Sequence, residues 1–136
     1  MKKLLLLFFL VASVYSMDAQ RIQNSSRSTT GYIKSDGTIQ NSSRRTCGYI
    51  KDNGTIQDVS RRTIGYIKDN GTIQNASRST VGYLKENGTV QDSSRRTIGY
   101  IKDNGNVQDS SRRTLGYASG VKKEWIAVTF FFFEFE

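Results

Sequence analysis

Residues 65–81 read Gly-Tyr-Ile-Lys-Asp-Asn-Gly-Thr-Ile-Gln-Asn-Ala-Ser-Arg-Ser-Thr-Val and carry the pattern from which the fold can be predicted. The same pattern recurs every 17 residues, and each occurrence begins with a Gly-Tyr pair. The pairs begin at Gly31, Gly48, Gly65, Gly82, Gly99 and Gly116. Periodicity this strict takes precedence over any local reading of secondary structure. The chain therefore contains five full repeats over residues 31–115.

Each repeat carries Asp-Asn-Gly, or a close variant, between two short runs rich in Ile, Val, Thr and Tyr. This composition is typical of a β-hairpin. A three-residue loop over residues 69–71 places Ile73 opposite Ile67, whereas a two-residue loop would place it opposite Lys68. Because two apolar side chains then share one face, we predict the longer loop, with Gly71 in the left-handed conformation.

A second joint, Asp-Ser-Ser-Arg-Arg at residues 92–96 and similar elsewhere, separates successive hairpins. Asp, Asn and Ser side chains that bond back to the backbone predict a turn there. Half a repeat, residues 22–30, precedes the first full unit, and another half, residues 116–117, follows the last. Pairing of these halves would close the array and remove its exposed strand edges. We therefore predict an all-β fold in which five β-hairpin repeats form a closed, pseudo-five-fold array, flower-like or propeller-like.

The C-terminal segment, about residues 121–136, departs from the repeat and contains Phe130–Phe133. Its composition predicts an extra C-terminal strand that caps or plugs the array, because a contiguous aromatic run needs to be covered. A membrane or partner contact is the alternative. Cys47, the single cysteine, stands where other repeats have Ile64 or Val81. We predict that it is a buried apolar residue and not a reactive thiol.

The N-terminal residues 1–19 are predicted to be a secretory signal peptide, because two lysines precede an apolar run over residues 4–15. That run is shorter than the roughly 20 apolar residues of a membrane span, so we expect no stable membrane anchor. Cleavage after Ser16 and after Ala19 both remain open. The mature protein is then a single β-repeat domain over residues 20–136, secreted, periplasmic or on the cell surface.

The chain resembles the small secreted bacterial five-fold β-flower repeat proteins. It shares with them the recurring pattern Gly-Tyr-Ile-Lys-x-Asn-Gly-Thr-Ile-Gln-Asp-Ser-Ser-Arg-Arg-Thr-Ile, behind a short signal peptide and before an aromatic C-terminal segment. The resemblance covers nearly all of the mature chain. It implies a bacterial source and a closed, pseudo-five-fold arrangement of hairpin petals, and it implies no established biochemical activity.

The composition restricts the chemistry that the protein can perform. The chain has no His, which excludes a nucleophile with a His base and the common His-containing zinc sites. Paired-carboxylate hydrolysis needs two acids in different surroundings, whereas Asp58, Asp92 and Asp109 occupy equivalent positions. The Asp-Asn-Gly turns each offer too few oxygens for calcium. We expect no catalytic residue, no cofactor and no metal.

The arginine pairs are the candidate site residues. In a closed array, equivalent joints would bring them to one rim, where they could hold a sulfate, phosphate or carboxylate group through bidentate contacts. The formal net charge of +8 suits anionic partners. The candidate ligand-binding residues are Arg44, Arg45, Arg61, Arg62, Arg95, Arg96, Arg112 and Arg113, with Arg27-Ser28 and Arg78-Ser79 as interrupted versions. In the competing interpretation, each Arg pairs with an Asp of its own or a neighbouring joint and only solvates the rim.

We predict a secreted, non-enzymatic binding or structural module that binds an anionic small molecule or an acidic polysaccharide at this arginine-rich rim. Export argues against nucleic acid as the partner. The tyrosines of the repeats would stack on sugar rings if exposed, but burial between petals is favoured. The alternative function is a surface or matrix assembly subunit that mates through its aromatic C-terminal strand, and a glycan hydrolase is third. The sequence leaves the oligomeric state open.

Overall fold

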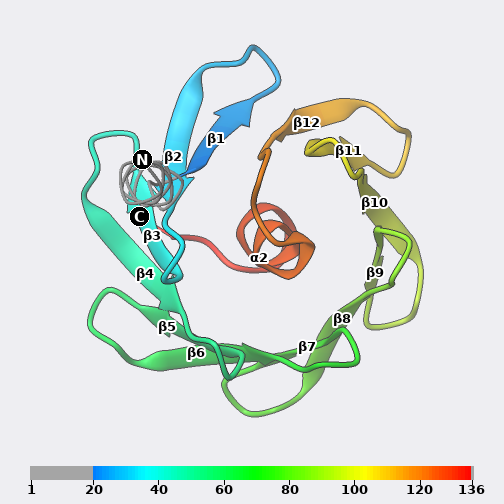
Figure 1. Ribbon diagram of the computed structural model, residues 1–136. Helices are drawn as coiled ribbons and strands as arrows, with labels where there is room; N and C mark the ends of the chain where they lie inside the picture. The colour runs from blue at the N-terminus through cyan, green and yellow to red at the C-terminus, as the bar shows by residue number, and fades with distance from the viewer. Residues whose placement is uncertain (1–19, 136) are drawn as a thin grey trace, which may run out of the picture.

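The repeats form a closed antiparallel barrel of twelve strands around a short helical segment (Figure 1), in a computed structural model that describes residues 20–135. Each strand pairs with the strands before and after it in the chain, so the loops alternate between the two ends of the barrel. The strands are β1 (Gln20–Asn24), β2 (Thr29–Ile33), β3 (Thr38–Asn41), β4 (Thr46–Ile50), β5 (Thr55–Asp58), β6 (Thr63–Ile67), β7 (Thr72–Asn75), β8 (Thr80–Leu84), β9 (Thr89–Asp92), β10 (Thr97–Ile101), β11 (Asn106–Asp109) and β12 (Thr114–Tyr117).

The barrel closes where the two ends of the repeat array meet. β1 pairs antiparallel with β12, with Gln23 opposite Tyr117 and Asn24 opposite Gly116. The equivalent pairs within the array, such as Tyr32 opposite Gln40, have the same register. The predicted all-β closed array is therefore confirmed, and the two half-repeats complete a sixth unit beside the five full ones.

The hairpin loop has the predicted length. Ile67 lies opposite Ile73, the backbone N–H of Lys68 donates to the carbonyl of Thr72 at 2.9 Å, and that of Gly71 donates to Lys68 at 2.9 Å. Gly71 has a φ of 90°, in the left-handed region. These contacts confirm a three-residue loop that ends on a left-handed glycine.

The same loops join neighbouring repeats. The carbonyl of Gly71 accepts a 2.8 Å hydrogen bond from the backbone N–H of Leu84 in the next repeat. A Cβ atom built at Gly71 would collide with the carbonyl oxygen of Leu84. Two features therefore require glycine at this position. Its φ lies in the left-handed region, and strand β8 approaches too closely for a side chain.

The core lies inside the barrel, where an Ile, Val or Leu from each of the strands β1–β11 points inward and Ala118 takes the equivalent place after β12. Ile56, Ile73, Val90 and Val107 are completely buried. A bulge in each repeat adds a further residue, and Cys47 occupies it in the pairing of β3 with β4. Cys47 is buried, as predicted, whereas Leu115 at the same position of the last repeat is 37% exposed.

The C-terminal segment corrects the sequence prediction. It plugs the barrel as expected, but it is helical and not a strand: α2 (Lys123–Ala127) continues into a π-helical turn, η1 (Val128–Phe132). Because the barrel ladder is closed, it offers no edge on which a strand inside could satisfy its backbone N–H and C=O groups. A helix satisfies these groups internally, and it also directs consecutive side chains to different parts of the wall, whereas a strand would direct them to two opposite sides.

The position of this plug also bears on the assembly role. The aromatic rings of residues 130–133 pack against the core, inside the closed ladder. The segment is not the strand through which mating with another chain was expected. Its rings are half-buried, and an assembly role stays a prediction. The predicted signal peptide, residues 1–19, lies outside the described residues. Within residues 20–135, none of the helices has the length and apolar character needed to cross a bilayer.

Candidate functional site

The joint that carries the arginines has the same backbone as the Asp-Asn-Gly loop. At residues 75–79, the backbone N–H of Asn75 donates to the carbonyl of Ser79, and that of Arg78 donates to Asn75, both at 2.9 Å. The position that Gly71 takes in the other loop is thus taken here by Arg78, whose φ is 66°. Five other arginines have φ values between 65° and 68°, namely Arg27, Arg44, Arg61, Arg95 and Arg112.

A left-handed conformation is unfavourable for arginine, at a cost of about 1–2 kcal/mol relative to the right-handed region. The side chain at the start of the joint offsets part of this cost. Asp92 Oδ1 accepts backbone hydrogen bonds from Ser94 and Arg96, both at 2.9 Å. Asn75 Oδ1 makes the equivalent pair at 3.0 Å. Asp and Asn are therefore interchangeable as acceptors in this turn.

The acceptor role lowers the pKa of the joint aspartates. Hydrogen bonds from the backbone N–H of Arg62 to Asp58, of Arg96 to Asp92 and of Arg113 to Asp109 are the largest cause in each case. The neighbouring guanidinium adds to the shift. All three carboxylates are therefore ionised in neutral solution.

Each left-handed arginine lies over a tyrosine of the preceding hairpin. The guanidinium carbon of Arg44 is 4.0 Å from the centre of the Tyr32 ring, and that of Arg78 is 3.9 Å from the centre of Tyr66. The seam between the chain ends makes the same contact, with Arg27 3.9 Å from the centre of Tyr117. The remaining stacks are Arg61 on Tyr49, Arg95 on Tyr83 and Arg112 on Tyr100. We call these six contacts the Arg–Tyr stacks.

The second arginine of each pair has a different environment. Nε of Arg62 lies 3.1 Å from a carboxylate oxygen of Asp58 in the same joint, and the Arg62 side chain is 83% exposed. Arg96 and Arg113 make the equivalent exposed ion pairs. Arg45 differs because its joint begins with Asn41 in place of an aspartate. For these second arginines the competing interpretation, pairing with an Asp of the same joint, holds at three of four positions.

The structure thus divides the eight predicted site residues into two sets. The first arginine of each pair, at positions 44, 61, 95 and 112, is stacked on a tyrosine, whereas the second is bound to its own joint or open to solvent. The stacked set also includes Arg27 and Arg78, which were singled out only as interrupted pairs. The signal that could have found them is the alignment of the two loops within one repeat, which places these arginines at the glycine position.

All six joints lie at one end of the barrel, since the loops of the meander alternate between its ends. Figure 1 shows the loops from β1 to β2 and from β11 to β12 pointing away from the central helix. The arginines are therefore distributed around the barrel, one stack per hairpin, and do not converge on a single pocket. The tyrosines are half-buried on the outer face.

Three cavities between neighbouring hairpins each contain one Arg–Tyr stack. One of about 450 Å³ lies beside Tyr49 and Arg61 and is also lined by Asp36, Lys51 and Asn53. A second, of about 840 Å³, contains Tyr83 and Arg95, and a third, of about 520 Å³ at the barrel seam, contains Tyr117 and Arg27. Each cavity combines an aromatic ring, a guanidinium and amide or carboxylate oxygens. Within residues 20–135, no cluster of acidic or Cys side chains could hold a metal ion.

Comparison with known protein families matches residues 19–134 to the family described as 5-fold beta-flower protein. Neither the curated proteins nor the solved structures include a significant match. The family match spans the whole barrel, including the half-repeats that close it and most of the plug. The chain therefore belongs to the 5-fold beta-flower protein family.

Proposed function

We propose that the protein is a non-enzymatic binding module that holds an acidic polysaccharide at its Arg–Tyr stacks. The observation that carries the proposal is the left-handed backbone of six arginines. Strained conformations persist where the surrounding structure enforces them, and they concentrate at functional sites. Here the strained backbone places the guanidinium carbon of each arginine 3.9–4.0 Å from the centre of a tyrosine ring.

The stack suits a sugar acid chemically. The tyrosine holds the guanidinium by its face, which leaves the N–H groups at its edge directed outward for a carboxylate or sulfate. Asn and Asp oxygens from the neighbouring Asp-Asn-Gly loops line the same cavities and can accept hydrogen bonds from sugar hydroxyls. A ligand that is anionic and also rich in hydroxyls satisfies both sets of groups.

The arrangement also suits a polymer better than a single small anion. Six similar sites around one barrel can be engaged by several units of one chain, and each added contact is then intramolecular. Weak individual sites become collectively strong by this route. We expect strong dependence of binding on polymer length and on salt concentration.

Two matched variants test the proposal. The first replaces the stacked arginines at positions 44, 61, 95 and 112 with Gln, and the second replaces their neighbours at positions 45, 62, 96 and 113 with Gln. Both remove four positive charges, so general electrostatic attraction falls equally. We expect the first variant to bind immobilised heparin or alginate about tenfold more weakly than the second, measured by surface plasmon resonance with neutral dextran as control. Equal affinities of the two variants, or unchanged binding by the first, would contradict the proposal.

A further inference from the structure

The plug places one phenylalanine ring against each of five glycines on the inner wall. These glycines are the ones that begin the Gly-Tyr pairs, and a Cβ atom built on any of them would collide with the ring. Phe130 lies against Gly116, Phe131 against Gly99, Phe132 against Gly82, Phe133 against Gly65 and Phe135 against Gly48. We call each of these contacts a ring seat. The bare backbone of glycine lets an aromatic ring lie directly on the strand.

The sixth equivalent position, Gly31, has no ring. The three atoms nearest to a Cβ atom built there all belong to the backbone of Gln40 and Asn41, at 2.6–3.8 Å. On the plug, the residue before the phenylalanine run is Thr129, whose hydroxyl donates to the carbonyl oxygen of Trp125 at 3.0 Å. Among the described residues, the plug thus supplies five rings for six seats.

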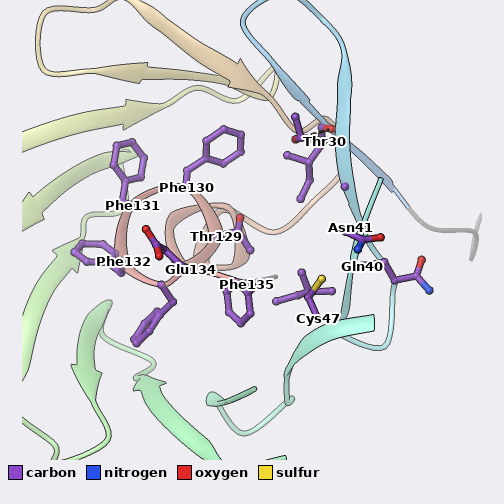
Figure 2. Close-up of a pocket in the computed structure, with 14 residues that line it drawn as sticks. Thr30, Gln40, Asn41, Cys47, Thr129, Phe130, Phe131, Phe132, Glu134 and Phe135 are labelled. Atoms are coloured by element: carbon purple, nitrogen blue, oxygen red, sulfur yellow. Dashed lines mark hydrogen bonds between the residues drawn. The ribbon is translucent and has the colours of Figure 1, made fainter. Parts of the chain in front are cut away.

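An open cavity of about 770 Å³ lies at this sixth seat and is lined by both Gly31 and Thr129. Figure 2 shows the rings of Phe130, Phe131, Phe132 and Phe135 directed to different parts of the wall, with open space between Thr129 and the strand that carries Thr30. The cavity walls include the buried side chains of Ile22 and Ile39. Asn41 adds an amide group to the lining.

We propose that this cavity binds a neutral small molecule that carries a single aromatic ring. The ring takes the seat on Gly31, flanked by Phe130 and Phe135, as the protein's own rings do at the other five glycines. Asn41 Oδ1 already accepts hydrogen bonds from the backbone of Ser43 and Arg45. A hydroxyl or similar polar substituent on the ligand therefore accepts from Asn41 Nδ2 or is solvated at the mouth. The class of ligand follows from the seat itself, because a flat ring fits against a glycine backbone and a thicker saturated ring fits less well.

Benzyl alcohol serves as the probe, and ¹H–¹⁵N NMR of the full mature chain as the measurement. We expect saturable shifts centred on the amides of Gly31, Asn41 and Thr129, with a Kd on the order of 1 mM, as is usual for a fragment of this size. Cyclohexylmethanol is expected to bind several-fold more weakly. No saturable shift, shifts spread over the whole surface, or equal binding of the saturated analogue would overturn the proposal.

Three variants locate the site. Thr129→Phe supplies the missing ring from the plug, and we expect it to reduce benzyl alcohol affinity at least tenfold. Thr129→Val removes the hydroxyl without filling the cavity, so it should retain binding. If Thr129→Phe fails to fold, Thr30→Phe blocks the same cavity from the wall and should likewise abolish binding. Undiminished binding by a folded, cavity-filling variant would overturn the proposal.

Discussion

The two loops of each repeat have the same backbone but opposite chemistry at their left-handed position. At one end of the barrel this position is glycine, as at Gly71, because the carbonyl of Leu84 in the next repeat leaves no room for a side chain. At the other end it is arginine, as at Arg78, whose side chain extends across Tyr66. One loop therefore joins neighbouring repeats through their backbones, and the other presents a charged group to solvent. Glycine in the first loop is required by the fold, whereas arginine in the second would be required only by a binding function.

The largest effect is expected where glycine is required by the fold. Gly71→Ala introduces a Cβ atom at a φ of 90° and against the carbonyl oxygen of Leu84. We expect the free energy of unfolding to fall by at least about 2 kcal/mol, because both strain and a backbone clash contribute. Urea unfolding followed by circular dichroism measures the change. A loss below about 0.5 kcal/mol would show that both loops tolerate a side chain at the left-handed position. The proposed difference between the two loops would then be wrong.

An intermediate case is the replacement of arginine by glycine at the opposite loop. Arg78→Gly relieves about 1–2 kcal/mol of backbone strain. Against this, glycine adds conformational entropy to the unfolded chain at a cost of about 0.5–1 kcal/mol, and a cation–π contact of about 0.5–1 kcal/mol is lost. We therefore expect the stability to change by less than about 0.5 kcal/mol in urea unfolding.

Extending this change to all six left-handed arginines should leave a folded barrel that no longer binds acidic polysaccharide. The matched control is the same number of exposed arginines and lysines elsewhere, replaced by neutral residues. If the six-fold glycine variant unfolds at room temperature, the arginines serve the fold and the contrast between the two loops is lost.

The smallest effect concerns the acceptor at the start of each arginine joint. Asp58, Asp92 and Asp109 have lowered pKa values in the folded state, so their stabilising contribution is present above their ordinary pKa of 3.8 and is lost as the pH falls below it. The triple replacement by Asn should be nearly neutral at pH 7, since Asn41 and Asn75 already accept the same bonds.

We expect the melting temperature of the triple variant to fall less steeply than that of the parent between about pH 4 and pH 2. Some dependence should remain, because Asp36 and Asp103 also have lowered pKa values and are unchanged. Thermal melts at a series of pH values provide the measurement. Parallel curves for parent and variant would mean that the joint carboxylates do not contribute to acid sensitivity.

Much of the barrel could be predicted because its determinants are local and repeated. The loop over residues 69–71 follows from face matching of Ile67 and Ile73, and closure follows from complementary half-repeats at the chain ends. The arginine joint was predicted only as a turn, because an arginine gives no local signal for a left-handed φ. The stack of such an arginine on a tyrosine could not be predicted from local sequence, because Arg44 lies in the joint after β3 whereas Tyr32 lies in β2.

The repeat, the hairpins, the glycine loops and the meeting of the two chain ends can all be read from the amino-acid sequence, because each depends on residues that are near neighbours or that recur every 17 positions. The conformation of the plug, in contrast, depends on the closed barrel around it. Residues 121–136 have the composition of a strand, but the closed ladder leaves no backbone groups for a strand to pair with. The plug is helical for that reason, and the direction of its side chains determines which inner glycines receive a ring and which one does not.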